Sequence, residues 1–369
     1  MKILFIGGLQ CGGAERQMTT LARELKQKGF DVHYLYSVES GTFFLSEIQK
    51  MDIACHCIKV PYIVAVLRLS IPFLYYSLVK IIKKEKFNVV ISFLGMWNFI
   101  NCMASKKLHG SFLAITGLRN NRADAMITMR HKFYIKYEKY TSCKVSNSEN
   151  AKQSFLKIYP EYEGKLITIY NMVNLPKIDS VYSIRKNNKV NIIVPASYRD
   201  VKNAKGLVEA LRLMDKEQLE RIKIDWYGTI DKISLNYYTE LKELVIKYNL
   251  AETIVLNGAT NDIANRVNES DVVALFSKSE GLPNAICEGM MLGKPIIMTR
   301  TSDYEIMVND DNGILCDSYD SLSIKEALVR YGNMENSQLI AMGKASRKKA
   351  EILFSRENVI KQWIDLISK

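Results

Sequence analysis

The feature that most constrains the fold is a short apolar run that recurs along the chain, each time before a segment with helical periodicity. In the first half these runs span residues 2–6, 32–36, 89–93 and 113–115, and a helical pattern over 14–29 follows the first of them. Short apolar runs bounded by glycine or polar residues are typical of strands buried on both faces of a parallel sheet. Such strands, alternating with helices, predict a doubly wound α/β sheet.

The same alternation starts again after a polar break at residues 179–190. Expected strands lie at 191–195, 222–227, 254–256, 272–276 and 295–298, with helices at 204–214, 237–248, 263–269 and 284–292. A chain of 369 residues is also too long for one ordinary core. We therefore predict two Rossmann-like domains, at 1–180 and 181–355, and a last helix at 356–369 that crosses back to the first domain. Ligands are expected in the cleft between the carboxyl ends of the two sheets.

The positive charge is confined to one half of the chain. The formal net charge is +12, and residues 1–180 hold 25 Lys or Arg against 13 Asp or Glu, whereas residues 181–369 hold 26 of each. This asymmetry indicates that the N-terminal half meets an anionic surface or substrate. Nucleic acid, phospholipid head groups and a diphosphate-linked acceptor all fit the charge.

Neither a membrane-spanning helix nor a metal site is expected. Arg68, Ser70 and Pro72 interrupt the most apolar stretch, residues 61–79, and the first residues read as a strand rather than a signal peptide. The seven cysteines are odd in number and irregular in spacing, which argues against a disulfide framework. The sequence Cys-His-Cys at 55–57 has no second Cys/His pair at zinc spacing. Buried thiols in a reducing cytosol are the expectation.

The strongest candidate site is the segment from Glu280 to Glu288. A predicted strand ends near Phe276, a Gly/Pro turn follows, and a helix begins at about Asn284. Backbone N–H groups at a helix start favour anionic oxygen atoms. Glu288, one turn into the helix, can accept hydrogen bonds from a ribose diol, and Glu280 can orient the loop or touch a donor sugar. The alternative is an ordinary helix start with surface acids.

This segment, with its Gly-Leu-Pro-Asn-Ala filling and the Gly-Lys-Pro after it, resembles the E-x7-E signature of the large retaining glycosyltransferase family with the GT-B fold. The resemblance covers nearly the whole chain. Further segments that resemble the family lie at residues 12–16, 145–148, 169–174, 202–211, 312–315 and 342–363.

The resemblance implies a role for each matching residue. Arg199 and Lys202 would neutralise the donor diphosphate as it departs, and Glu288 would hold the ribose. Many members carry an arginine five residues before this lysine; Ser197 stands there, so Arg199 is expected to serve, and the alternative is a solvated turn. Glu280 and the following backbone would hold the sugar and phosphate, and two glycines near the N-terminus would let the backbone approach the diphosphate. These backbone positions are Gly281, Leu282, Pro283, Asn284 and Ala285, with Gly12 and Gly13 in the first domain.

The implied reaction is transfer of a hexose or similar sugar from a nucleoside diphosphate, with UDP expected, to a polysaccharide or lipid-linked glycan. Retention of configuration by a front-face route would make the leaving phosphate the proton acceptor, so no protein base is needed. The sequence shows no Asp-x-Asp triplet, and no metal or other cofactor is expected.

The basic N-terminal half is expected to supply an acceptor or membrane surface that holds the protein at the inner face of the cytoplasmic membrane. Aromatic and aliphatic residues surround the basic ones. The residues assigned to this surface are Lys80, Lys83, Lys84, Lys86, Arg119, Arg122 and Arg130. The alternative is one core-packed helix and one solvated helix.

Two other functions remain open. A nucleotide-sugar epimerase can use the same two-domain fold, and turnover of the donor without an acceptor would favour it. A basic nucleic-acid-binding protein fits the charge, but no nucleic-acid module is recognised and the segment from Glu280 to Glu288 would then have no role, so nucleic acid is not an expected partner.

Overall fold

The computed structural model describes residues 1–10, 12–38, 41–67, 69–119, 129–173 and 189–368, and the chain divides into two compact units. The first unit comprises Met1–Met172 and Arg356–Lys369, and the second comprises Val173–Ser355. The sequence prediction placed the boundary after residue 180, which falls in a segment outside the described residues. The last helix, α17 (Arg356–Ile367), belongs to the first unit.

The first unit is built on a parallel sheet with strand order β3-β2-β1-β4-β5-β6-β7 within its described residues. Side chains of β1 alternate, so that Ile3 and Phe5 enter one core and Leu4 and Ile6 enter the other. The sheet is therefore buried on both faces, which explains its short apolar strands. The strands are β1 (Lys2–Ile6), β2 (Asp31–Ser37), β3 (Ala54–Ile58), β4 (Val89–Ser92), β5 (Leu113–Leu118), β6 (Cys143–Ser146) and β7 (Leu166–Thr168).

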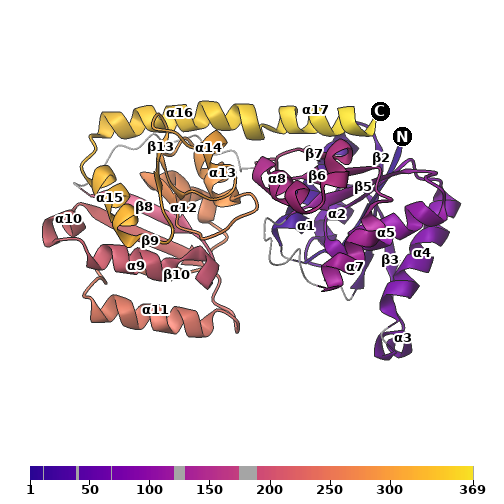
Figure 1. Ribbon diagram of the computed structural model, residues 1–369, viewed down its shortest axis with the longest axis horizontal. Coiled ribbons are helices and arrows are strands. Elements are labelled where there is room, and N and C mark those ends of the chain that lie inside the picture. Colours follow the sequence, from indigo (N-terminus) through magenta and orange to yellow (C-terminus); the bar gives the residue numbers. More distant parts are fainter. Residues whose placement is uncertain (11, 39–40, 68, 120–128, 174–188, 369) are drawn as a thin grey trace. The chain divides into compact units, whose positions relative to one another are not determined.

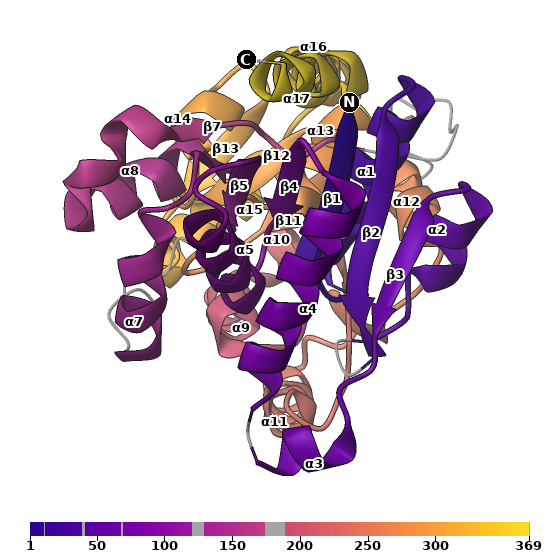
Figure 2. The same ribbon diagram turned by 90° about the vertical axis from the view of Figure 1, so that its right-hand side faces the viewer.

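Helices cover both faces of this sheet (Figure 2). The core on one face takes side chains from α1 (Gly13–Gln27), α2 (Leu45–Lys50) and α17. The core on the other face takes them from α4 (Ser70–Glu85), α5 (Gly95–Lys107) and α7 (Met129–Glu138). A third, small cluster forms around α8 (Glu149–Ile158) and the 3₁₀ turn η2 (Pro160–Lys165). The short helix α3 (Tyr62–Val66) contributes no buried residue.

The second unit repeats the architecture with strand order β10-β9-β8-β11-β12-β13, again with parallel pairing. Figure 1 shows α9 and α11 on one side of this sheet and α13 and α16 on the other. The strands are β8 (Val190–Pro195), β9 (Ile222–Gly228), β10 (Ile254–Gly258), β11 (Val272–Leu275), β12 (Ile296–Thr299) and β13 (Gly313–Cys316). The helices are η3 (Asp200–Lys202), α9 (Ala204–Arg212), α10 (Lys216–Glu220), α11 (Leu235–Lys247), α12 (Ile263–Glu269), α13 (Asn284–Met291), α14 (Tyr304–Met307), α15 (Ser321–Gly332) and α16 (Asn336–Phe354).

The predicted fold class, two doubly wound parallel sheets, is confirmed. Most expected strands appear within a residue or two of their predicted ends, and β5 runs three residues further than expected, to Leu118. Strands β3, β6, β7 and β13 were not among the strands expected from the hydrophobic pattern. Strand β3, at the sheet edge, has the sequence Ala-Cys-His-Cys-Ile, which lacks the continuous apolar run of a central strand. Residues 61–79 form α3 and α4 rather than one long apolar helix, and no helix in the described ranges is long and apolar enough to cross a membrane.

Each sheet has a point at which its strand order reverses. In the first unit it lies between β1 and β4, and in the second between β8 and β11. Loops that leave two such strands diverge to opposite faces of the sheet and open a crevice at its carboxyl edge, where doubly wound folds bind ligands. The loops after β8 and β11 are therefore where the second unit is expected to bind a ligand.

Candidate functional site

The centre of the candidate site is an ion pair between the loops that follow β8 and β11. Lys202 ends η3, and its Nζ lies 2.5 Å from Oε1 of Glu280, in the loop after β11. The two side chains are only 23% and 13% exposed. Although 78 residues separate them in sequence, the strand order places their loops side by side at the carboxyl edge of the sheet. The topology thus unites the lysine and glutamate that the sequence assigned to one site.

The loop after β8 has a fixed shape that places Lys202. Asn203 takes a left-handed conformation with φ 61°, which ends η3 and starts α9, and its side-chain amide donates to the carbonyl of Ser318 at 2.7 Å. A Cβ atom at Gly206 would lie 2.6 Å from the Asn203 side chain, so glycine gives that side chain its room. The segment is thus ordered before any ligand arrives.

A second ion pair joins the two loops. Lys278 Nζ lies 2.8 Å from Asp200 Oδ2, and the Lys278 N–H donates to the carbonyl of Val201 at 2.8 Å. Both contacts are close to the pair of Lys202 and Glu280 in sequence. They hold η3 against the loop after β11.

Hydroxyl groups at the end of β12 fix the Glu280 loop from its other side. The Glu280 N–H donates to Thr301 Oγ1 at 2.9 Å, and the Ser302 hydroxyl donates to the Gly281 carbonyl. Thr299 Oγ1 donates to the carbonyl of Ser277 at 2.6 Å, and Ser277 Oγ in turn donates to Glu280 Oε1 at 2.6 Å. The sequence analysis missed these residues. The signal was the run of hydroxyl residues directly after a predicted strand.

Helix α13 directs its amino end toward this edge of the sheet. A Cβ atom at Gly289 would lie 2.8 Å from the Val273 side chain, so glycine lets α13 pack closely on β11. Pro283, at the N-cap, brings no side-chain hydrogen bond, and the first turn from Asn284 contains no Asp or Glu. A helix start of this kind attracts anionic oxygen atoms. Glu288 lies partly buried within the helix.

The other predicted donor residues of this loop lie with the pair. Leu282 and Pro283 are buried, and Gly281, Asn284 and Ala285 are partly buried. Their backbone connects Glu280 to the start of α13 without a break. The structure therefore brings Lys202, Glu280 and the helix start together.

Arg199 lies apart from the central ion pair. It is half exposed, and its Nη2 lies 3.5 Å from Oδ2 of Asp231, in the loop after β9. Backbone and side-chain hydrogen bonds from Ser234 lower the pKa of Asp231, with Arg199 a smaller cause. An exposed pair of this kind contributes little to stability, so it leaves the guanidinium able to turn toward another anion.

The glycines of the first unit adjoin a carboxylate. Gly12 precedes α1 with φ −133°, and a Cβ atom there would collide with Oε2 of Glu15. Glycine therefore allows Glu15, which is buried, to fold back over the start of α1 beside Gly13. The Glu15 carboxylate therefore occupies the space next to Gly12.

The residues predicted as one basic surface do not form a single surface. Lys80, Lys83, Lys84 and Lys86 are exposed on or beside α4. Arg119, at the end of β5, instead packs inward: its guanidinium carbon lies 3.6 Å from the centre of the Phe93 ring, and Nη1 donates to Asn171 Oδ1 at 2.9 Å. Burial lowers the Arg119 pKa to about 9, which leaves it protonated at neutral pH. Arg122 and the side chain of Arg130 lie outside the described residues.

The Cys-His-Cys segment forms the edge strand β3. His56 Nε2 lies 2.9 Å from His33 Nδ1, and burial lowers the pKa of both histidines. Cys57 is exposed and Cys55 half-buried, so the expectation that all the thiols are buried is wrong for this strand. Within the part of the chain that the structure describes, no three His, Cys, Asp or Glu side chains are placed to hold a metal ion.

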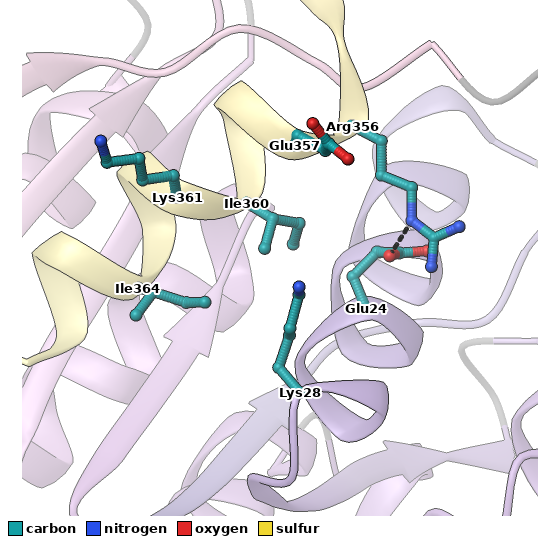
Figure 3. Close-up of a pocket in the computed structure, with 7 residues that line it drawn as sticks. All are labelled: Glu24, Lys28, Arg356, Glu357, Ile360, Lys361 and Ile364. Carbon is teal, nitrogen blue, oxygen red and sulfur yellow. Dashed lines mark hydrogen bonds and ion pairs between the residues drawn. The ribbon is translucent and has the colours of Figure 1, made fainter.

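A hollow of about 440 Å³ lies away from these loops, between α1 and α17 of the first unit (Figure 3). Arg356 reaches from α17 to Glu24 on α1 and forms an ion pair with it. Lys28 lines the hollow at the far end of α1 from Gly12, and none of the predicted site residues lines it. The ion pair anchors α17, and the hollow takes no part in the candidate site.

Both units match known sequence families. Residues 11–177 match the family described as Glycosyltransferase Family 4, and residues 177–349 match the family described as Glycosyl transferases group 1. Together the two matches cover both units.

Curated relatives include the N-acetyl-alpha-D-glucosaminyl L-malate synthase of Bacillus anthracis, 21% identical over 53% of this chain and 51% of that protein. Another is the UDP-Gal:alpha-D-GlcNAc-diphosphoundecaprenol alpha-1,3-galactosyltransferase of Escherichia coli, 33% identical over 32% of this chain and 29% of that protein. The chain thus spans about half the length of these relatives or less. Among solved structures, Anabaena Alr3699/HepE in complex with UDP has a TM-score of 0.82 at 15% identity, over 100% of both chains.

Proposed function

The chain belongs to the group 1 glycosyltransferases of GT-B fold, and we propose that it moves a sugar from a UDP-sugar to a polysaccharide or lipid-linked glycan. We further propose that it retains the anomeric configuration and needs no metal ion. The observation that carries this proposal is the ion pair of Lys202 and Glu280 beside the start of α13.

In the proposed mechanism, the donor diphosphate lies between the Lys202 ammonium group and the N–H groups at the start of α13. As the bond from the anomeric carbon to the diphosphate oxygen breaks, negative charge grows on that oxygen. A cation and oriented N–H dipoles that are already in place stabilise this charge at little reorganisation cost. The Ser277 hydroxyl and Lys202 both donate to Glu280, so its carboxylate is held ready to accept from a sugar hydroxyl.

The remaining roles follow from position. Glu288, within α13, accepts hydrogen bonds from the ribose hydroxyls, and Arg199 turns from Asp231 to the diphosphate when the donor binds. The acceptor hydroxyl attacks from the face that the diphosphate leaves. It passes its proton to the departing phosphate oxygen, so no protein base is required.

A lipid-linked acceptor is supported by the charge and by one relative. Residues 51–150 hold 15 Lys or Arg and only five Asp or Glu. The Escherichia coli relative is named for a diphosphoundecaprenol acceptor, whose diphosphate would be attracted by this positive charge. We propose that the protein works at the inner face of the cytoplasmic membrane, where such an acceptor resides.

Two measurements test the function. A thermal-shift series with UDP-, GDP- and ADP-sugars is expected to raise Tm with UDP-sugars alone. Transfer to a short polyprenyl-diphosphate-linked sugar is then followed with and without EDTA, and the anomeric configuration of the product is read by NMR. Inverted product or loss of activity in EDTA would contradict retention or metal independence. Donor epimerised without an acceptor would favour an epimerase instead.

A further inference from the structure

Helix α3 and the residues just after it expose an apolar surface that no described residue of the first unit covers. Tyr62 is 85% exposed, Ile63 67% and Leu67 61%, and Val66 and Leu69 are also exposed. We call these five residues the apolar tip. Figure 2 shows α3 projecting beyond the end of α4, away from the sheet. Contiguous exposed apolar residues of this kind mark an interaction surface in a water-soluble fold.

The exposed face of α4 continues this surface and changes from apolar to basic along its length. Pro72, Tyr76, Lys80 and Lys83 follow one another at intervals of four, four and three residues, which places them on one face of the helix. We call these four residues the outer stripe. The opposite face is buried in the core of the first unit through Leu74, Leu78 and Ile82. A helix of 16 residues is about 24 Å long, so the stripe runs far along the surface.

Among the described residues, the acids of α4 and α7 are already paired within the fold. Glu85, at the end of α4, lies 2.7 Å from Lys2 Nζ. Glu138, on α7, forms a buried ion pair with Lys144. Within the described part of the chain, Lys80 and Lys83 form no ion pair, so they present positive charge to whatever contacts them.

Charge decides between the possible occupants. A second copy of this chain would bring the same lysines against the stripe and be repelled. An anionic bilayer is complementary, because its interior accepts the apolar tip while its head groups attract the lysines. Each basic residue near such a surface strengthens binding about fivefold, and the aliphatic stems of lysine lie easily along an apolar surface.

We propose that the apolar tip and the outer stripe form a docking surface for an anionic bilayer. The tip enters the boundary between head groups and acyl chains, α4 lies along the membrane plane, and Lys80 and Lys83 contact the head groups. This inference rests on the membrane location proposed above and assigns a surface to it. Its test requires no enzymatic activity, so a failure to dock would leave the proposed transfer reaction standing.

Vesicle sedimentation tests the proposal with the full chain. The protein is expected to bind vesicles of phosphatidylcholine and phosphatidylglycerol at 7:3 but not pure phosphatidylcholine, and binding is expected to weaken in high salt. Ile63→Ser with Leu67→Ser is expected to weaken binding about 10-fold or more. The matched control is Ile246→Ser with Ile352→Ser, which alters equally exposed apolar residues of the second unit and is expected to have no effect.

The lysines have a matched control of their own. Lys80→Gln with Lys83→Gln is expected to weaken binding about 30-fold. Lys216→Gln with Lys348→Gln removes the same charge from exposed positions of the second unit and is expected to change binding far less. Equal weakening by both pairs would mean that net charge alone, rather than this surface, attracts the vesicles, and would overturn the proposal.

A fluorescent reporter tests insertion of the tip directly. The native tryptophans, Trp97, Trp226 and Trp363, are all buried, so Tyr62→Trp adds an exposed one whose emission is expected to shift to the blue on anionic vesicles. Unchanged emission from vesicle-bound protein would overturn insertion. Wild-type protein that stays in the supernatant would overturn docking. A dimer that dissociates on Ile63→Ser with Leu67→Ser, without vesicle binding, would place a second copy on the tip instead.

Discussion

Replacing Lys202 with methionine removes the ammonium group and keeps most of the side-chain volume. The group lies 2.5 Å from Glu280 and is mostly shielded from water. A full charge developing about 4 Å from such a cation is stabilised by about 4 kcal/mol at an effective dielectric constant of about 20. Since only part of that charge develops at the transition state, we expect a loss of about 2.7 kcal/mol. This corresponds to about a 100-fold lower kcat at 1.36 kcal/mol per decade.

The assay compares kcat and KM for Lys202→Met with those for a matched neighbour. Lys205, three residues later, forms its own exposed ion pair with Glu240, so Lys205→Met removes a nearby cation without touching the site and is expected to keep near-normal kcat. Thermal unfolding of both variants shows whether folding is intact.

A double-mutant cycle separates two roles of the same lysine. If Lys202 acts only by holding Glu280, its removal in a Glu280→Gln background costs nothing further. If it also faces the departing diphosphate, the double variant is expected to be about 10-fold slower than Glu280→Gln alone. Near wild-type kcat/KM for Lys202→Met would refute the reasoning altogether.

The remaining predictions concern the same unit. Glu288→Ala is expected to weaken UDP-sugar and UDP alike by about 10-fold, and calorimetry showing unchanged UDP affinity would contradict the ribose role. Thr301→Val removes the hydroxyl that accepts from the Glu280 N–H, at nearly constant side-chain volume. KM for the donor is expected to rise about 10-fold and the free energy of unfolding to fall by about 1 kcal/mol. An unchanged KM would contradict the role of Thr301 in positioning the loop. Gly228→Ala forces a Cβ atom onto a backbone carbonyl and is expected to lower the free energy of unfolding, measured by chemical denaturation, by about 2 kcal/mol. Gly258 pairs with Gly228 across the sheet and has open space where a Cβ atom would lie, so Gly258→Ala is expected to change that free energy by less than about 0.5 kcal/mol. Burial lowers the pKa of Lys294 to about 8, so between about pH 8 and 10.5 the unfolded chain holds more protons than the folded chain and this group makes stability rise with pH. Lys294→Met is expected to remove on the order of 2 kcal/mol of that rise between pH 8 and 9.5. Stability profiles of the variant and the wild type that stay parallel over this pH range would contradict the prediction.

The parts of the fold that followed from the sequence are those with local causes. Strands buried on both faces must be short and apolar, so β1, β8 and β11 could be predicted from composition alone. The start of α13 could be predicted from the Gly/Pro turn before it. Edge strand β3, with histidine and cysteine in it, carries no such signal.

The parts of the site that did not follow depend on contacts between distant segments. Lys202 and Glu280 were both named from sequence, but their direct pairing depends on β8 and β11 being neighbours in the sheet. Thr301 and Ser302 have ordinary side chains that gain a role only through the loop they bind. Arg119 was assigned to a surface because it lies among the basic and aromatic residues of the N-terminal half, whereas its stacking on Phe93 is a tertiary contact.

The exposure of the apolar tip could not be predicted from the sequence either. The composition of its residues is that of a core segment, whereas α4 is amphipathic and buries Leu74, Leu78 and Ile82 on one face. Whether a second element covers five apolar residues is a property of the whole fold, because burial depends on what packs there. Only the structure shows that no part of the first unit does so within its described residues.

The position of α17 affects the order in which the protein can fold during synthesis. Val359, Ile360 and Trp363 fill the same core as α1, and the Trp363 ring lies 5.9 Å from that of Phe93. These residues leave the ribosome only after the entire second unit has been made. The second unit can therefore complete its core first, while the first unit, although its sheet is translated earlier, waits with an open apolar face. A premature stop after residue 355 would consequently damage the unit at the opposite end of the gene.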